Sequence, residues 1–421
     1  MRVLLVGSGG REHAMAWMFR RSPSVTRLLW APGNGAAASD EILAVKADDV
    51  ARLVHAAEKE RVDLVAVGPE GPLADGIWDA LNAKGIPCFG PSQAAARLES
   101  SKAFCKHFCR DHAIPTSDFT VWNSLPEAKA YLESYTGPYP LVLKADGLAA
   151  GKGVLICADR AEALEGAETI LGRKAFGAAG DRMVVEAFVA GEEASLMVFC
   201  DGETVVPMPP ARDHKRVGDG DKGPNTGGMG AFCPSPRMSA SQIEEALGKV
   251  IRPAVAALSS AGTPYRGVLY AGLMLTVDGP QVLEFNCRLG DPETQVVLPL
   301  LDGDLGEIAM GCATGALSEC SISWKPAAAV TVVLCSEGYP GTYATGKPID
   351  GLEAASDIPG VVVFQAGTRR EGGRLLTAGG RVLDVTAVAA TLGEARARAY
   401  EAAGRIRFEG KVSRSDIAAD W

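Results

Sequence analysis

The first hundred residues alternate short apolar runs with amphipathic helical patterns, and this alternation constrains the fold most. The apolar runs are Val3–Val6, Leu28–Trp30 and Leu64–Val67, and the helical patterns lie near Glu12–Arg20, at 49–60 and at 72–84. Strands that alternate with helices pair in parallel, because each helix carries the chain back across the sheet. Helices then cover both faces, so we expect a doubly wound parallel sheet over residues 1–100.

The rhythm changes near Pro91. Ala94–Arg110 has the pattern of one helix, which Ser92 can cap. Further patterns are strands at 140–144, 153–156 and 183–186, a hairpin of Gly267–Thr276 with Gln281–Asn286, strands at 329–335, 361–365 and 381–386, and a closing helix at 391–407. At about 150 residues per domain, a chain of this length suggests roughly three domains. We expect boundaries at 1–100, 101–325 with a small lid subdomain at 120–190, and 326–421.

Composition narrows the class of protein. Hydrophobic residues make up 47% of the chain and charged residues 22%, which are ordinary values for a soluble globular protein. The formal net charge of −9 disfavours a nucleic-acid binder. No apolar run approaches the roughly 18 residues of a membrane span, and the N-terminus carries no leader pattern. The ten cysteines are scattered without a CxxC pair, so we expect reduced thiols and a cytoplasmic enzyme.

The segment Asp213–Gly230 combines charge, glycine and small polar residues, so it cannot build a core. A compact domain rarely keeps a structureless loop of this length without a use for it. We therefore expect a long functional loop here.

Gly7-Ser-Gly-Gly10 follows a predicted strand and opens a predicted helix. In that geometry backbone N–H groups and the helix dipole bind phosphate, although a purely structural turn has the same pattern. It is a poor dinucleotide fingerprint, because Arg11 or Glu12 stands where the third glycine belongs. Gly68–Pro72 follows another parallel strand and points to the same crevice.

Lys144 closes an apolar strand, and the glycine-rich segment Asp146–Gly153 follows it at once. Small residues let backbone amides approach phosphate oxygens and let the loop close as a lid. The GxxxxGK[ST] string of a P-loop is absent. The alternative is a flexible turn with an exposed lysine.

Val282–Asn286 has the most informative pattern. Alternation directs Leu283 and Phe285 toward a core, while Glu284 and Asn286 share the other face. A carboxylate and an amide oxygen two residues apart suit Mg²⁺. Arg288 continues that face, and its planar fork suits phosphate or an acyl phosphate. The alternative is a solvated strand face.

Together, 213–230 and 281–293 resemble the active site of ATP-grasp ligases, and in detail the phosphoribosylamine–glycine ligase family of purine biosynthesis. The resemblance spans the chain and includes Thr345–Ile349 and Thr377–Arg381. It implies an α/β architecture, with an ATP-grasp fold between a doubly wound N-terminal domain and a small mixed C-terminal domain. The chain departs from the family at Ala31–Ala37 and at Gln365, where we expect histidine.

The resemblance also implies an ATP site. Lys102 would reach the nucleotide phosphates, Glu186 and the backbone near Phe188 would meet the adenine, and Glu193 the ribose. The full set implied for ATP is Lys102, Lys144, Gly147, Gly151, Lys152, Gly153, Glu186, Phe188 and Glu193. Glu284 and Asn286 would bind Mg²⁺ or Mn²⁺. Many ATP-grasp enzymes add an acid from the facing strand, but Leu269–Leu275 has none, so the number of ions stays open.

For the other substrates, the resemblance places loop 213–230 over glycine and 5-phosphoribosylamine. The implied substrate-binding residues are Gly9, Gly10, Arg11, Glu12, Asp213, His214, Lys215, Asn225, Thr226, Arg288, Gly290 and Asp291. Lys144, Asp213 and Arg288 are the expected catalytic residues, with Asp213 on the glycine ammonium. We expect His214 to be a neutral, hydrogen-bonding residue rather than a general base.

The implied reaction couples glycine to 5-phosphoribosylamine through glycyl phosphate and converts ATP to ADP and phosphate. We expect small-molecule substrates, no nucleic acid or membrane partner, and a monomer or homodimer. The alternatives are a related ATP-grasp ligase or carboxylase, a nucleotide-binding regulator without activity, and a nicotinamide oxidoreductase.

Overall fold

The N-terminal sheet has four parallel strands in the order β2-β1-β3-β4. They are β1 (Arg2–Gly7), β2 (Arg27–Pro32), β3 (Leu64–Val67) and β4 (Cys88–Phe89). Alternate residues of β1 enter different cores, since Val3 and Leu5 pack against Phe19 of α1 (Gly10–Arg21) while Leu4 and Val6 pack with Leu53 of α2 (Val50–Glu60). Both faces are therefore covered, which confirms the doubly wound sheet.

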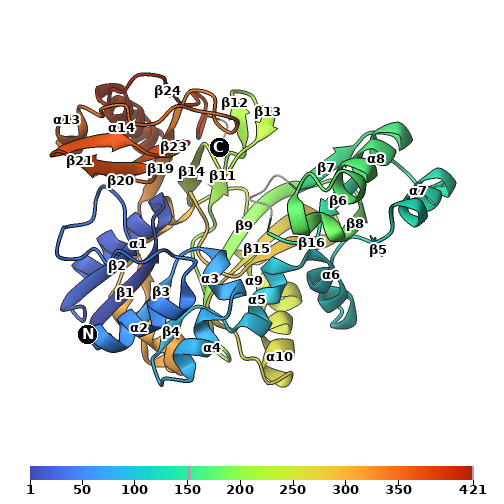
Figure 1. Cartoon of the computed structure of the whole chain (residues 1–421), viewed down its shortest axis with the longest axis horizontal. Coiled ribbons are helices and arrows are strands. Elements are labelled where there is room, and N and C mark those ends of the chain that lie inside the picture. The colour runs from blue at the N-terminus through green and yellow to red at the C-terminus, as the bar shows by residue number, and fades with distance from the viewer. Residues whose placement is uncertain (149–152, 420–421) are drawn as a thin grey trace.

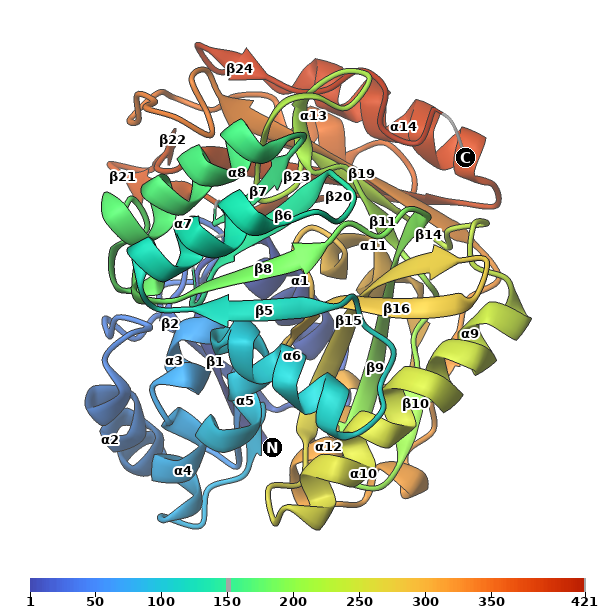
Figure 2. The ribbon, with the colours of Figure 1, turned by 90° about the vertical axis from the view of Figure 1, so that its right-hand side faces the viewer.

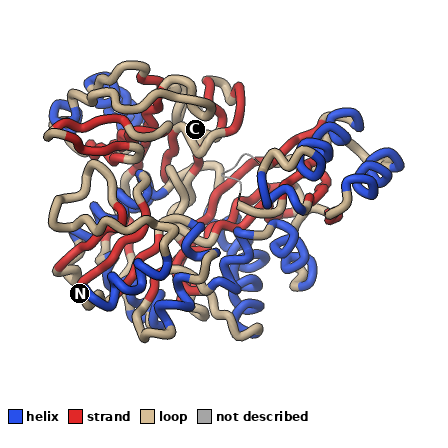
Figure 3. Tube along the Cα trace, in the orientation of Figure 1, coloured by secondary structure: helices blue, strands red, loops and turns tan. Residues whose placement is uncertain are grey.

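The computed structural model describes residues 1–148 and 153–419 (Figures 1 and 3).

Two segments predicted as single helices are each broken in two. The 72–84 pattern is α3 (Glu70–Ala74) and α4 (Ile77–Asn82), separated by Gly76 with φ +83°. The 94–110 pattern is α5 (Gln93–Ser100) and α6 (Lys102–Asp111). Between them Ser101 is extended, because its hydroxyl accepts from Phe104 N (3.1 Å) and donates to Asp146 (3.0 Å). Helical periodicity continues through such a cap and cannot reveal it.

The segment predicted as a lid contains a four-stranded antiparallel sheet in the order β5-β8-β6-β7, which projects at the right of Figure 1. Its strands are β5 (Phe119–Trp122), β6 (Leu141–Ala145), β7 (Val154–Cys157) and β8 (Met183–Ala187). Helices α7 (Leu125–Ser134) and α8 (Arg160–Ala167) cover one face (Figure 2), where Leu132 and Ala163 share a core with Leu143.

The central sheet, β10-β9-β15-β16, is also antiparallel. Its strands are β9 (Glu192–Asp201), β10 (Val205–Pro207), β15 (Arg266–Thr276) and β16 (Gly279–Asn286), and α9 (Ala240–Ala246) and α10 (Arg252–Ser260) lie against it. The predicted hairpin is present, but a β-bulge makes Leu283 an extra residue, with Glu284 opposite Gly272 and Val282 opposite Leu273. Val282 and Phe285 therefore enter the core, and Leu283 is only half-buried, contrary to the simple alternation.

The C-terminal sheet takes strands from the middle of the chain. Its order is β11-β14-β19-β23-β20, and β24 (Lys411–Val412) pairs with β19. The other strands are β11 (Arg212–Asp213), β14 (Gly230–Cys233), β19 (Ala328–Ser336), β20 (Val361–Gln365) and β23 (Arg381–Ala389), and α14 (Leu392–Arg405) packs on the sheet. Segment 213–230 is thus not structureless, since it also forms the hairpin β12 (Arg216–Gly218) and β13 (Lys222–Asn225).

The remaining elements are short, apart from α12, which packs in the same core as β1 and α1. They are α11 (Thr294–Val297), α12 (Leu305–Thr314), α13 (Leu352–Ser356), β17 (Leu301–Asp302), β18 (Ser323–Trp324), β21 (Thr368–Glu371), β22 (Arg374–Thr377), π-helical turns at Glu168–Gly172 and Leu247–Ile251, and 3₁₀ turns at Gly177–Asp181, Leu298–Leu300 and Leu317–Glu319. Within 1–148 and 153–419, no helix has both the length and the apolar character to cross a bilayer. All ten cysteines are free thiols, as expected from their spacing.

Candidate functional site

The end of β16 brings Glu284, Asn286 and Arg288 together. Asn286 Nδ2 donates to Glu284 Oε1 at 3.4 Å, and Arg288 donates to Asn286 Oδ1 at 3.0 Å. Two carboxylates from the first hundred residues, Glu99 (2.8 Å) and Glu70 (3.2 Å), hold the Arg288 guanidinium. Arg288 is therefore fixed in place, with its fork shared between two acids and an amide oxygen.

Three lysines surround Glu284. Burial alone would raise the pKa of Glu284, but the charges of Lys215, Lys144 and Lys102 hold it below its ordinary value. The carboxylate is thus ionised, and three lysine ammonium groups interact with it. Such a site suits a polyphosphate together with a hard cation.

The donor set of this strand end fits Mg²⁺. Among residues 1–148 and 153–419, no three His, Cys, Asp or Glu side chains converge on a metal by themselves. Mg²⁺ usually takes one or two protein oxygens and completes its shell with phosphate and water. An ionised Glu284 beside the Asn286 amide provides that number of protein ligands.

Lys144 and Glu186 belong to a buried ion triad with Lys106, which sequence reasoning missed. Glu186 Oε1 lies 2.9 Å from Lys144 Nζ, and Oε2 lies 2.7 Å from Lys106 Nζ. Burial opposes ionisation, but Lys144 and Lys106 lower the pKa of Glu186 below its ordinary value. Lys144 also donates to Leu283 O (3.0 Å), which ties the lid to β16. The available signal for Lys106 was its position four residues after Lys102 on one helix.

The connector between lid and central sheet lines a cavity of about 670 Å³. Its walls are Phe188–Gly191 and, from the β15–β16 hairpin, Leu275–Asp278 and Gln281. Phe188 is 43% exposed, and the Glu193 carboxylate beyond the connector lies 3.4 Å from Lys215 Nζ. Of the predicted adenine and ribose residues, only Phe188 lines this cavity, while Glu193 lies beyond it and the Glu186 carboxylate faces the two lysines.

The glycine-rich lid loop is described only at its ends. Lys102 Nζ donates to Gly147 O at 2.8 Å, and Ala145 N donates to Gly153 O at 2.8 Å. Gly147 has φ +148°, where a side chain would be strained. The predicted ligands Gly151 and Lys152 lie outside the described residues.

Loop residues 213–215 point in alternate directions. Asp213 and Lys215 interact with each other and with Glu193 and Glu284, so they join the carboxylate–lysine cluster. His214 lies on the opposite side, against Phe232 and near Arg414, and is only 3% exposed. Burial, and then nearby arginines, lower the pKa of His214 to about 4, which favours the neutral ring. Neither ring nitrogen has a hydrogen-bond partner among the described residues, contrary to the hydrogen-bonding histidine expected. His214 does not join the cluster with its two neighbours.

At the far end of loop 213–230, the side chain of Thr226 makes its hydrogen bonds within the loop. Thr226 Oγ1 donates to Lys215 O (2.9 Å) and accepts from Gly228 N (2.9 Å), so its hydroxyl is used within the loop. Asn225 pairs with Arg216 across the β12–β13 hairpin. Neither is in contact with the β16 strand end through a side-chain hydrogen bond, in the part of the chain that the structure describes.

In the glycine turn, Glu12 folds back onto the backbone. Gly9 N donates to Glu12 Oε2 and Arg11 Nε to Glu12 Oε1, both at 2.5 Å. Arg11 also donates to Leu289 O at 3.2 Å, next to Gly290. The turn opens into a cavity of about 270 Å³, lined by Ser8, Gly9, Gly10, Asp291, Tyr339, Ala366, Gly367 and Arg381.

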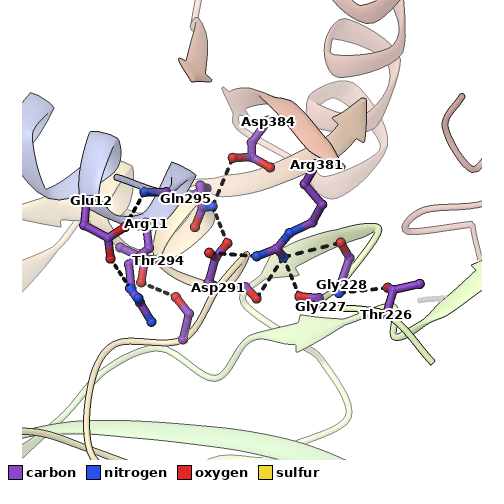
Figure 4. Close-up of polar contacts among 12 residues, drawn as sticks. Arg11, Glu12, Thr226, Gly227, Gly228, Asp291, Thr294, Gln295, Arg381 and Asp384 are labelled. Atoms are coloured by element: carbon purple, nitrogen blue, oxygen red, sulfur yellow. Dashed lines mark hydrogen bonds and ion pairs between the residues drawn. The ribbon is translucent and has the colours of Figure 1, made fainter. Parts of the chain in front are cut away.

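Arg381 and its neighbours join all three parts of the chain at this cavity (Figure 4). Arg381 pairs with Asp291 Oδ2 (2.8 Å) and donates to the Gly227 carbonyl of the loop. Gln295 Nε2 donates to Asp291 Oδ1 (2.8 Å) and Asp384 Oδ2 (3.1 Å). Sequence reasoning included Arg381 in a family-like motif without a role, and it missed Gln295 and Asp384.

Gln365, the departure from the expected histidine, acts here through its backbone. Its N–H donates to His13 Nδ1 (2.7 Å), and its carbonyl accepts from Asn34 Nδ2 (2.6 Å). The side-chain oxygen accepts from Thr368 Oγ1 at 3.0 Å. The residue therefore joins the last sheet to the first.

Comparison with known proteins places this geometry in a family. The phosphoribosylglycinamide synthetase models match in three parts, with the N domain at 1–99, the ATP-grasp (A) domain at 100–294 and the C domain at 329–420. The chain is 50% identical to phosphoribosylamine–glycine ligase of Caulobacter vibrioides, covering 99% of this chain and 97% of the relative. The corresponding Allochromatium vinosum protein is 48% identical, with 99% and 98% covered.

A solved structure agrees. The crystal structure of phosphoribosylamine–glycine ligase from Thermotoga maritima is similar with a TM-score of 0.83 and 35% identity, over 99% of this chain and 100% of that one. The fold is thus an ATP-grasp fold between N- and C-terminal domains, as expected, and the chain belongs to the phosphoribosylamine–glycine ligase family.

Proposed function

We propose that this chain ligates glycine to 5-phosphoribosylamine through glycyl phosphate, converting ATP to ADP and phosphate. One observation carries the proposal: an ionised Glu284, linked to Asn286 and Arg288, lies among three lysines. A free carboxylate is a poor electrophile and must be activated before an amine attacks it. Several lysines and an arginine at one place can stabilise the phosphoryl group that performs this activation.

In the first step, a glycine carboxylate oxygen attacks the γ-phosphorus of ATP, and the bond to ADP breaks. Lys102, Lys144 and Arg288 are proposed to bind the phosphoryl oxygens. Glu284 and Asn286 would hold Mg²⁺, or Mn²⁺ with the same donors, which when bound offsets phosphate charge. Positioning of the reactants contributes most of the remaining acceleration.

Glycine is proposed to bind beside the loop. Asp213 would accept hydrogen bonds from the glycine ammonium. Burial raises the pKa of Asp213, and Lys215 opposes that effect from two residues further along the chain. The phosphoribosylamine amine then attacks the carbonyl carbon of glycyl phosphate, loses a proton, and phosphate leaves.

The phosphoribosylamine phosphate is proposed to enter the cavity at Gly9 and Gly10. The N-terminus of α1 and Arg381 both face it, and each favours an anion. Asp291 and Gly290 would border the ribose side. This assignment adds Arg381 to the residues inferred from sequence and explains the need for a C-terminal domain.

ATP is proposed to lie between lid and central sheet, with adenine at the connector near Phe188 and its ribose at Glu193. The cavity lined by Phe188 supports the placement of the adenine. Glu186 would act mainly by positioning Lys144. We also propose domain boundaries at 1–100, 101–325 and 326–421, a lid at 120–190, and a cytoplasmic location, for which the free thiols are support.

The test is ADP release from ATP and Mg²⁺, with glycine or freshly generated phosphoribosylamine omitted in turn. Stoichiometric ADP and ligation product only when both are present is the expected result. ADP release with bicarbonate in place of glycine would indicate a carboxylase. ATP binding without release in any mixture would indicate a regulator.

A further inference from the structure

The β12–β13 hairpin at the tip of loop 213–230 is held by the C-terminal tail. Its two strands pair only with each other in the described part of the chain. Residues 414–417 lie against it, although almost two hundred positions separate the two segments.

Arg414 is the centre of this contact. One guanidinium nitrogen donates to Arg216 O (3.0 Å) and to Asp221 Oδ1 (2.7 Å). The other two guanidinium nitrogens each donate to one carboxylate oxygen of Asp416, both at 2.7 Å. Arg414 itself is only 3% exposed, whereas its partner Asp221 is exposed and Asp416 is partly buried. The planar guanidinium makes four charge-assisted or backbone contacts at once, which fixes its geometry.

Two further contacts flank Arg414. Asp219 accepts from Ser415 N (2.8 Å) and Ser415 Oγ (2.5 Å), and Gly220 N donates to Asp416 Oδ2 (2.7 Å). The turn of the hairpin is therefore bonded at consecutive positions.

The tail is itself fixed to the C-terminal domain. Tyr400 of α14 donates to Arg414 O and accepts from Ile417 N, both at 3.0 Å. Arg396 donates to Ser415 O and Ile417 O, and the Ile417 side chain lies against Gly230 of β14. The hairpin thus takes its position from α14 by way of the tail.

The hairpin in turn positions the cluster at Glu284. Its first strand follows Lys215 directly, and its second strand ends before Thr226, which bonds back to the Lys215 carbonyl. Asp213 is also held by its pairing with β14, whereas Lys215 directly adjoins the hairpin. A shift of the hairpin therefore changes the position of Lys215 relative to Asp213, Glu193 and Glu284. A displacement of about 1 Å at reacting groups costs up to about 100-fold in rate.

We propose that Arg414 is a positioning residue for ligation: it holds the loop so that Asp213 and Lys215 bind glycine and shield glycyl phosphate from water. The inference rests on the proposed function. When the loop loosens, water attacks the carbonyl carbon of glycyl phosphate, the bond to phosphate oxygen breaks, and glycine and phosphate are released without ligation. ATP is then consumed without product.

The experiment measures ADP and ligation product together in the full chain carrying Arg414→Ala. The KM for glycine should rise about 10-fold and that for ATP by less than about 2-fold, because the loop flanks glycine. The ratio of ADP to product should exceed the wild-type ratio. Arg414→Lys should recover part of both, since lysine keeps the charge but not the fork.

The matched control is Arg405→Ala, which removes an exposed arginine of α14 paired with Glu401. It should leave the KM for glycine and the ratio of ADP to product unchanged. If Arg414→Ala does not fold, Asp219→Ala releases the hairpin from an exposed position and replaces it. Wild-type KM values and coupling in a folded variant would overturn the proposal. A wild-type enzyme that makes no ligation product would instead overturn the proposed function.

Discussion

At the scale of the residue, Glu284 is the side chain on which most of the site's electrostatics converge. Glu284→Gln keeps the shape but removes the charge that faces Lys215, Lys144 and Lys102. We expect turnover to fall by at least about 100-fold, as when one preorganised group of a charged transition state is lost. Steady-state ADP release over a range of Mg²⁺ concentrations measures the effect, and thermal unfolding shows that the variant is folded.

A suitable control for this change is Glu245→Gln, a surface acid paired with Lys249. It alters the net charge equally and should retain full activity. If Glu284→Gln keeps normal Mg²⁺-dependent turnover, the assignment of this carboxylate as the metal ligand is wrong.

Residue patterns predicted part of this site. Period-two alternation places Glu284 and Asn286 together, because the bulge precedes both and leaves their spacing intact. The same bulge makes the prediction for Leu283 wrong. Lys106 and Arg381 could not be assigned, because their partners, Glu186 and Asp291, lie 80 and 90 positions away. Only the folded chain brings such groups within bonding distance.

At the scale of the element, the Lys106–Glu186–Lys144 triad joins α6, β8 and β6. Glu186→Gln would leave two buried lysines without their counter-charge, so we expect unfolding to become easier by about 3–5 kcal/mol. Urea unfolding followed by circular dichroism measures the loss. Glu165→Gln, an exposed lid acid paired with Arg173, should change stability by less than about 1 kcal/mol. Equal losses in both would show that burial does not strengthen the triad.

Elements were predictable where hydrophobic periodicity was uninterrupted. β3 (Leu64–Val67) matches the predicted run, whereas the helix predicted over 94–110 breaks at Ser101. The break has a tertiary cause, since Asp146 accepts from the Ser101 hydroxyl and also from Ala103 N (3.0 Å). It places Lys102 at the start of a new helix, where its ammonium reaches Gly147 O.

At the scale of the whole molecule, Asp384 makes the contact between the last sheet and the first domain sensitive to pH. Burial, and then the neighbouring Asp291 carboxylate, raise the pKa of Asp384 from 3.8 to about 7, although Arg381 opposes them. A raised folded-state pKa stabilises the fold at low pH, and this contribution is lost as pH rises toward 7. The absence of a side chain at Gly10 lets the Asp384 carboxylate lie against the start of α1, because a Cβ there would lie 1.8 Å from Asp384 Oδ2.

Asp384→Asn should remove that dependence. The variant's unfolding free energy relative to wild type should therefore rise between about pH 4 and pH 7, with a limiting slope of about 1.4 kcal/mol per pH unit, and level off above pH 7. Calorimetry across this range tests the expectation, with the exposed Asp357→Asn as the control. A constant difference from wild type would mean that Asp384 keeps one protonation state throughout.

The last domain contributes to the site chiefly through Arg381, which reaches Asp291, the loop carbonyl of Gly227 and the cavity at Gly9 and Gly10. A charge-assisted contact to phosphate is worth about 2–3 kcal/mol, so Arg381→Met should raise the KM for phosphoribosylamine about 30- to 100-fold. The KM for ATP should change by less than about 2-fold, because the proposed nucleotide site lies between lid and central sheet.

Arg370→Met separates this role from a general loosening of the contact between domains. Arg370 also comes from the last domain and donates to Gly35 O of the first (2.9 Å), but it does not line the cavity. Its loss should leave the KM for phosphoribosylamine near the wild-type value. Arg381→Lys should recover part of the affinity as a point charge without the planar fork. If Arg381→Met weakens ATP and phosphoribosylamine equally, Arg381 acts through the domain arrangement and not on the substrate phosphate.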